Sequence, residues 1–307
     1  MNEPVWKSGV PRTILLATDL SARSDRALDR AVLLARAWKA RLVALTVVED
    51  SQVLAQQVAL GDPPPWYRPR DPREVAAAQL RADAAASDVD IDIRVEQGNA
   101  GEWILDVAQA EGCSLIVTGV ARREALGRAV LGSTVDRLVR HARVPVLVVQ
   151  RRARQDYRGL LAASDWSSSS RYALQAATEL FPQATLTVLH GFDVPFLGMM
   201  DTRRDDAIEQ AGEQARAEGM EFLRQCRLPG GAGDVRLVVE RGDPAQLLPQ
   251  YAQQHPADLA VLGTHGRSAL FDIVLGSVAR RILEASPIDT LVVRDPRAGE
   301  GQRRTAP

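Results

Sequence analysis

The sequence predicts an α/β protein in which the strands of a parallel sheet alternate with amphipathic helices. Short apolar runs of strand length recur along the chain, and longer stretches with apolar residues at helical spacing separate them. This alternation is typical of parallel strands that are joined by helical crossovers. Each half of the chain carries five such strands, which predicts one five-stranded parallel sheet per half.

An internal repeat divides the chain into two domains. The glycine pattern of residues 119–133 recurs in a more complete form at residues 263–277. The chain has 307 residues, which exceeds the size at which a single hydrophobic core usually stops growing. We therefore expect one domain at residues 1–150 and a second, homologous domain at residues 151–307.

The individual elements follow in chain order from these patterns. Predicted strands lie at residues 12–18, 42–48, 91–96, 115–119 and 146–150, and again at 159–164, 185–190, 235–240, 259–263 and 290–294. Predicted helices lie at residues 24–39, 102–111, 134–141, 170–180, 205–226, 244–255 and 278–285. We expect the strand order 3-2-1-4-5 in each sheet, with helices on both faces.

Local signals indicate where helices begin and where the chain is irregular. Ser21 and Ser167 stand before the first helix of each domain and are of a residue type that caps helices. Pro244 directly after Asp243 suits the first turn of another helix. Residues 50–72 contain three consecutive prolines, which predicts an irregular surface loop.

Composition excludes several classes of partner. The formal net charge is −1, so no overall field attracts nucleic acid or an anionic membrane. No apolar run approaches the length of a membrane span. The two cysteines have no metal-binding spacing and are predicted to be buried thiols of a reducing compartment. We expect a cytoplasmic protein that binds neither nucleic acid nor membranes.

The strand order predicts where a ligand binds. In such a sheet, ligands settle at the carboxyl ends of strands 1 and 4, where the order reverses. In the second domain these ends carry Asp165 and Gly263, and Gly276 with Ser277 opens the last helix, whose first N–H groups favour phosphate. Phosphate charge would rest on these amides, on Arg267 and on Mg²⁺. Asp165 would accept hydrogen bonds from a base or a ribose.

Two alternatives stay open at these positions. Glycine after a strand also serves tight turns and close helix packing, so a glycine pattern alone is a weak indication of nucleotide binding. Trp166, beside Asp165, either stacks on a base or covers the start of the helix that follows.

Both halves resemble universal stress protein domains, whose signature is G-x-x-G, nine residues, then G-[ST]. The second half matches it from Gly263 to Ser277. The resemblance implies a Rossmann-like domain of the adenine nucleotide alpha hydrolase-like type, some members of which bind ATP. By motif, it assigns the nucleotide to Ala163, Ser164, Asp165, Gly191, Leu262, Gly263, Gly266, Arg267, Gly276, Ser277 and Val278.

The first half departs from the signature at Arg122, which stands where the second glycine belongs. Its side chain either fills the site, binds an anion through its guanidinium, or points away. The remaining motif positions are Thr18, Asp19, Val47, Gly119, Gly132, Ser133 and Thr134. We therefore expect the nucleotide mainly in the second domain and a weakened site in the first.

These observations predict a regulatory, ATP-binding stress-response protein rather than an enzyme. The sequence shows no assembled general base, nucleophile or lysine clamp for rapid phosphoryl transfer, although slow hydrolysis stays open. The alternative is a scaffold in which neither half binds nucleotide and the duplication acts as a covalent pseudo-dimer. By analogy with single-domain relatives, the fifth strands of the two domains would pair within the chain. A homodimer of such chains is left open.

Overall fold

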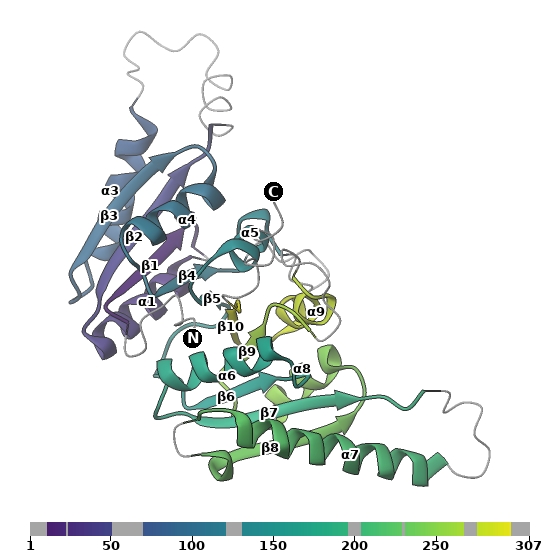
Figure 1. Cartoon of the computed structure of the whole chain (residues 1–307). Helices are drawn as coiled ribbons and strands as arrows, with labels where there is room; N and C mark the ends of the chain where they lie inside the picture. Colours follow the sequence, from purple (N-terminus) through teal and green to yellow (C-terminus); the bar gives the residue numbers. More distant parts are fainter. Residues whose placement is uncertain are drawn as a thin grey trace, which may run out of the picture. The chain divides into compact units, whose positions relative to one another are not determined.

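The computed structural model describes residues 11–22, 24–50, 70–120, 131–195, 204–228, 231–266 and 275–295. They divide into two units (Figure 1). The first domain, as it is called here, comprises residues 11–120 and 132–156, and the second domain comprises residues 157–295 together with Leu131. Arg122, Arg267 and the prolines of the predicted loop lie outside the described residues.

The elements of each domain alternate between strand and helix, as predicted. The first domain contains β1 (Thr13–Thr18), α1 (Asp25–Trp38), β2 (Arg41–Val48), α3 (Pro72–Ala84), β3 (Ile91–Gln97), α4 (Ala100–Ala110), β4 (Leu115–Gly119), α5 (Ser133–His141) and β5 (Val146–Val149). The second contains β6 (Gly159–Ala163), α6 (Ser168–Leu180), β7 (Thr185–Phe192), α7 (Arg204–Gln225), a 3-10 turn (Ala232–Asp234), β8 (Val235–Arg241), α8 (Pro244–Gln254), β9 (Leu259–Gly263), α9 (Ser277–Ala285) and β10 (Asp289–Val293).

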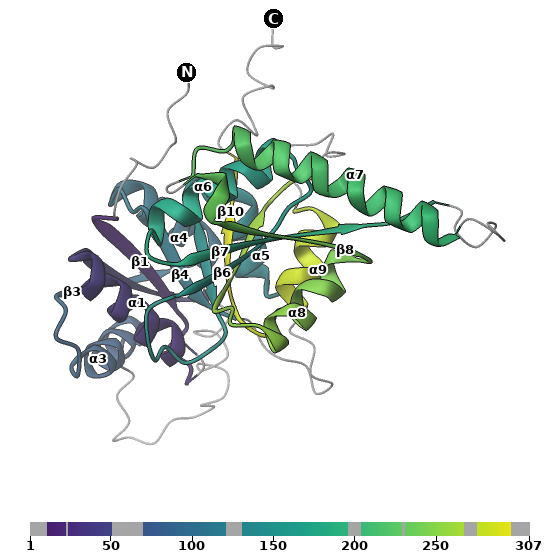
Figure 2. The ribbon, with the colours of Figure 1, turned by 90° about the horizontal axis from the view of Figure 1, so that it is seen from below.

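The strand order confirms the predicted topology in both domains. The strands run in the order β3-β2-β1-β4-β5 in the first domain and β10-β9-β6-β7-β8 in the second, and the pairs within each domain are parallel. In the second domain, α6 and α7 cover one face of the sheet, and α8 and α9 cover the other (Figure 2). The order reverses between β1 and β4, and between β6 and β9, so the two carboxyl ends at each reversal face the same edge.

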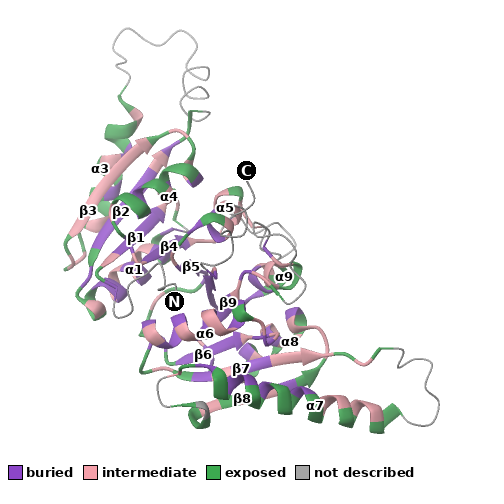
Figure 3. Ribbon diagram, in the orientation of Figure 1, coloured by how far each residue is buried: buried purple, intermediate pink, exposed green. Residues whose placement is uncertain are grey.

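The central strands form the core because helices cover both of their faces. Leu15 in β1 and Leu161 in β6 occupy corresponding places, and both are fully buried. Figure 3 shows that β1 and β6 are mostly buried. Both cysteines are free and buried, as predicted, and burial raises the pKa of the Cys113 thiol to about 12. None of the described helices combines the length and the apolar character needed to cross a bilayer.

Hydrogen bonds hold the segment after β5 against the first domain. Arg26 and Arg30, one turn apart on α1, donate hydrogen bonds of 2.8 Å to the carbonyl oxygens of Gln150 and Gln155. Arg30 is itself buried. The polar stretch that follows the first sheet therefore lies against α1.

Helix α3 is the element that the sequence analysis missed. Its stretch is rich in alanine, and only Ala76 and Leu80 are buried, so its apolar spacing is weak. Its start does carry a signal, because the Asp71 side chain accepts a hydrogen bond of 2.9 Å from the Arg73 N–H and Pro72 occupies the first turn. The same aspartate and proline pair starts α8, where it was recognised.

Of the two predicted serine caps, one is confirmed and one is wrong. The Ser167 hydroxyl accepts a hydrogen bond of 3.1 Å from the Ser170 N–H at the start of α6. In the first domain, Ser24 rather than Ser21 precedes α1, and it caps nothing with its side chain. The hydroxyls of Ser21 and Ser24 both donate to Asp19 instead.

Replacing Ser167 with alanine is expected to lower the free energy of unfolding by about 1 kcal/mol, because an N–H group of α6 loses its acceptor. Urea denaturation measures the change. Ser168→Ala is the control, since Ser168 is exposed in the first turn of the same helix. Equal losses in the two variants would contradict the capping role.

Candidate functional site

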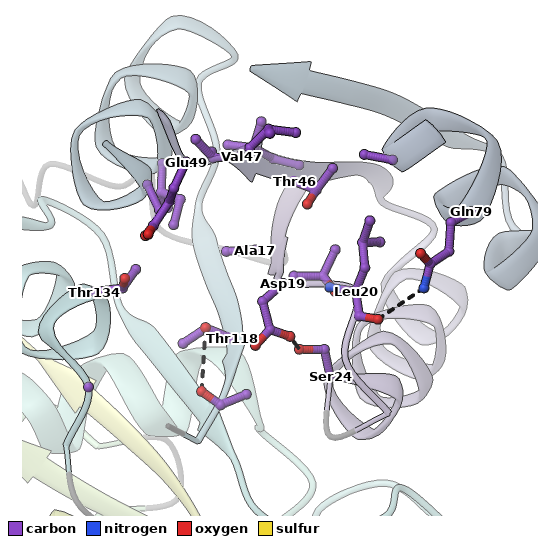
Figure 4. A pocket seen from close by; sticks show the side chains of 18 of the residues that line it. Ala17, Asp19, Leu20, Ser24, Thr46, Val47, Glu49, Gln79, Thr118 and Thr134 are labelled. Carbon is purple, nitrogen blue, oxygen red and sulfur yellow. Dashed lines mark hydrogen bonds between the residues drawn. The ribbon is translucent and has the colours of Figure 1, made fainter. Parts of the chain in front are cut away.

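A cavity of about 860 Å³ opens at the carboxyl ends of β1, β2 and β4 in the first domain (Figure 4). Its volume lies within the range of small-molecule sites. Helix α3 and the start of α5 contribute further walls. All seven first-domain positions assigned by motif line it, namely Thr18, Asp19, Val47, Gly119, Gly132, Ser133 and Thr134.

Sheet register brings these distant positions together. Ala17 of β1 is paired with Leu45 of β2 and with Thr118 of β4, so the residues after these three points leave the sheet side by side. The cavity therefore lies at the reversal of strand order, where the sequence analysis placed it.

Asp19 supplies a negative charge at the β1 end of the cavity. Its Oδ1 accepts hydrogen bonds from the Ser21 N–H at 3.0 Å, from the Ser21 hydroxyl at 2.6 Å and from the Ser24 hydroxyl. Removal of water on its own raises the pKa of Asp19, but the hydrogen bonds from Ser21 and Ser24 together lower it by more. Asp19 is thus held as a carboxylate. Ser21 and Ser24 bond to Oδ1 rather than to Oδ2, so Oδ2 is the oxygen that we expect a ligand to meet.

The start of α5 supplies N–H groups to the same cavity. The helix begins at Ser133, and Gly132 before it has extended backbone and no capping side chain. The first N–H groups of a helix have no partner within the helix and favour an anion. Ser133, Thr134 and Val135 all line the cavity. This end suits a phosphate, whereas the Asp19 end suits a group that donates hydrogen bonds.

Helix α3 forms a wall of the cavity that the sequence patterns did not predict. Pro72, Val75, Ala76 and Gln79 line the cavity, and the Gln79 side-chain amide donates a hydrogen bond of 3.0 Å to the carbonyl of Leu20. This bond ties α3 to the turn after β1. The helix-start signal at Asp71 and Pro72 could have revealed the helix, but not its place in the site.

The described lining contains few groups for catalysis. Its charged residues are Asp19, Glu49 and Arg70, and it includes no histidine, cysteine or lysine. Across the part of the chain that the structure describes, no three His, Cys, Asp or Glu side chains form a group able to hold a metal ion.

The lowered pKa of Asp19 makes part of the folding stability pH-dependent. A carboxylate with a depressed pKa stabilises the fold above its unfolded value of about 3.9, and the contribution is lost as the pH falls through the folded value. We expect the difference in unfolding free energy between the wild type and Asp19→Asn to shrink as the pH falls from 6 to 3. Urea denaturation across this range measures it, and a pH-independent difference would contradict the assignment.

The second domain repeats part of this arrangement. Ser164 and Asp165 follow β6, and Asp165 Oδ1 accepts hydrogen bonds from the Ser170 hydroxyl at 2.6 Å and the Ser167 N–H at 3.1 Å. Gly276 precedes α9 and donates a hydrogen bond of 2.9 Å to the carbonyl of Thr264. The other assigned positions follow the same plan: Ala163 ends β6, Leu262 and Gly263 end β9, Gly191 lies near the end of β7, and Ser277 and Val278 begin α9.

A Cβ atom added to any of three second-domain glycines would come close to another residue. A Cβ atom on Gly263 would lie 2.6 Å from the Ser169 hydroxyl, and one on Gly191 would lie 2.5 Å from the carbonyl oxygen of Gly242. A Cβ atom on Gly266 would lie 2.9 Å from Asp165 Oδ2, which brings the two predicted site residues Gly266 and Asp165 together. The packing alternative thus has direct support at Gly191 and Gly263, where backbone atoms lie close to the added Cβ.

Comparisons with known proteins agree with the fold and the repeat. The model of the universal stress protein family matches residues 11–150 and again residues 156–294. A universal stress protein of Mycolicibacterium smegmatis is 30% identical over 218 residues, which are 66% of this chain and 69% of that protein. One from Mycobacterium tuberculosis is 27% identical over 271 residues, covering 83% of this chain and 88% of the relative. The solved structure of a functionally unknown protein from Pseudomonas aeruginosa PAO1 shares the fold, with a TM-score of 0.63, 22% identity and coverage of 94% of both chains. With two consecutive matches that together span most of its length, this chain belongs to the universal stress protein family and carries two of its domains in tandem.

Proposed function

We propose that this universal stress protein binds ATP, together with Mg²⁺, and that nucleotide occupancy regulates its association with itself or with partners. The cavity of the first domain carries this proposal, because all seven motif-assigned residues of that domain line it. One end of the cavity accepts hydrogen bonds and the other donates them, which matches the base or ribose and the phosphates of a nucleotide. Asp19 would accept from the base or the ribose, and the start of α5 would donate to the phosphates.

The chemistry of the lining favours binding over catalysis. Rapid phosphoryl transfer needs a positioned base or nucleophile and a cationic clamp on the phosphates. Among the described lining residues, Arg70 is the one cation. We therefore propose a regulatory binding protein, in which any hydrolysis is slow. The pairing of the two domains within the chain, a homodimer and a cytoplasmic location stay predictions.

Mass spectrometry of the ligand released from purified protein, followed by calorimetric titration with Mg-ATP, tests the proposal. We expect ATP or a related adenine nucleotide in the released fraction, and saturable binding in the titration. An empty protein that gives no heat with Mg-ATP would contradict the proposal and leave the scaffold alternative.

The sequence predicts that the main nucleotide site lies in the second domain, and this stays a prediction. Its support is the complete glycine signature, whereas the support for the first domain is the cavity itself. Calorimetric stoichiometry alone does not say which domain is occupied, so the two domains require separate variants.

A further inference from the structure

Corresponding residues differ in bulk at the base end of the two sites. Leu20 and Trp166 each follow the aspartate after the first strand, and both have left-handed backbone, with φ of 58° and 64°. Thr46 and His190 also correspond, since each follows the leucine that is paired with the last alanine of that strand. Leu20 and Thr46 line the cavity of the first domain.

In the second domain these two positions are joined by a ring stack. The rings of Trp166 and His190 lie 4.4 Å apart between centroids at an interplanar angle of 23°. Because the carbonyl of Ser164 can only accept, His190 Nδ1 donates to it at 2.8 Å, which fixes the imidazole. Trp166 is only 8% exposed, so the ring lies inside the domain rather than over its surface.

Trp166 also reaches the helix that corresponds to α3. Its ring lies 5.3 Å from that of Phe222 on α7. A Cβ atom on Gly219, also in α7, would lie 2.9 Å from two carbons of the indole ring. Glycine inside a helix is destabilising relative to alanine, and here the close approach of the indole requires it. Among the described residues, Trp166 Nε1 has no hydrogen-bond partner, so packing holds the ring.

Residues of three elements line the cavity in the first domain, whereas aromatic side chains of the three corresponding elements pack on one another in the second. The three elements are the turn after the first strand, the end of the second strand, and the helix before the third strand. We propose that Trp166, stacked on His190, occupies the base end of the second-domain site and excludes adenine from it, so that the first domain alone binds the nucleotide. Trp166 is thus the residue that determines which of the two domains is used. This inference rests on the proposed function.

Exchanging the residues at positions 20 and 166 tests whether Trp166 excludes adenine from the second domain. Calorimetry with Mg-ATP on the full chain is expected to give one site for the wild type. Leu20→Trp should weaken binding at least tenfold, because an indole then enters the first-domain cavity. Trp166→Leu should raise the stoichiometry toward two. Trp166→Phe, which keeps a ring on His190, is the matched control and should stay at one.

The following results would overturn either this inference or the proposed function. Two sites in the wild type, unchanged binding by Leu20→Trp, or one site in a folded Trp166→Leu would overturn the inference while leaving ATP binding in place. If circular dichroism shows that Trp166→Leu is unfolded, His190→Thr replaces it, since it removes the other half of the stack and imitates Thr46. No heat from either the wild type or Trp166→Leu would overturn the proposed function, and this inference with it.

Discussion

Asp19→Asn is expected to weaken Mg-ATP binding about ten- to a hundredfold. The substitution keeps the shape of the side chain but removes its charge and places an N–H₂ group where a carboxylate oxygen accepts. A hydrogen bond to a charged group contributes about 1.5–3 kcal/mol, and 1.4 kcal/mol corresponds to a tenfold change in affinity. Oδ1 is already held by Ser21 and Ser24, so Oδ2 would meet the ligand. Isothermal titration calorimetry measures the affinity.

Asp25→Asn provides the matched control. Asp25 is an exposed aspartate in the first turn of α1 and does not line the cavity, so its neutralisation removes the same charge from nearby. We expect its affinity for Mg-ATP to match that of the wild type. Equal weakening in both variants would indicate a general electrostatic effect, and an unchanged affinity of Asp19→Asn would remove Asp19 from the site.

Gly191→Val is expected to destabilise the second domain by about 1–3 kcal/mol through overpacking. Valine is the residue at the corresponding place in the first domain, Val47, where it lines the cavity. At Gly191 a Cβ atom would lie 2.5 Å from the carbonyl oxygen of Gly242 and 2.9 Å from the ring of Pro244. The turn before α8 would have to move. Urea denaturation followed by circular dichroism measures the loss.

Gly233→Ala is the control for that substitution. A Cβ atom on Gly233 meets no atom within 4 Å, and its backbone does not have positive φ. We expect its stability to remain near that of the wild type. If Gly191→Val were as stable as Gly233→Ala, close packing would not explain this glycine, and its role in ligand approach would regain support.

Much of the site could be predicted because its markers are local in the sequence. Asp19 follows an apolar run, which predicts its place at the end of a strand. Gly132 and Ser133 stand before a stretch with helical spacing, which predicts their place at the start of a helix. The contribution of α3 to the cavity could not be predicted from local sequence patterns. Its buried face consists of Ala76 and Leu80 alone, too few apolar residues to give a clear period.

The sequence by itself determined the duplication, the parallel α/β topology and the edge of each sheet at which the motif residues gather. These features follow from periodicity and spacing, which are properties of neighbouring residues. Only the tertiary structure decided that a cavity of about 860 Å³ lies among the motif residues of the first domain and that Trp166 packs on His190 in the second. The physical reason is that Trp166 meets His190, Gly219 and Phe222 from separate elements, and whether space between elements is open or filled depends on packing.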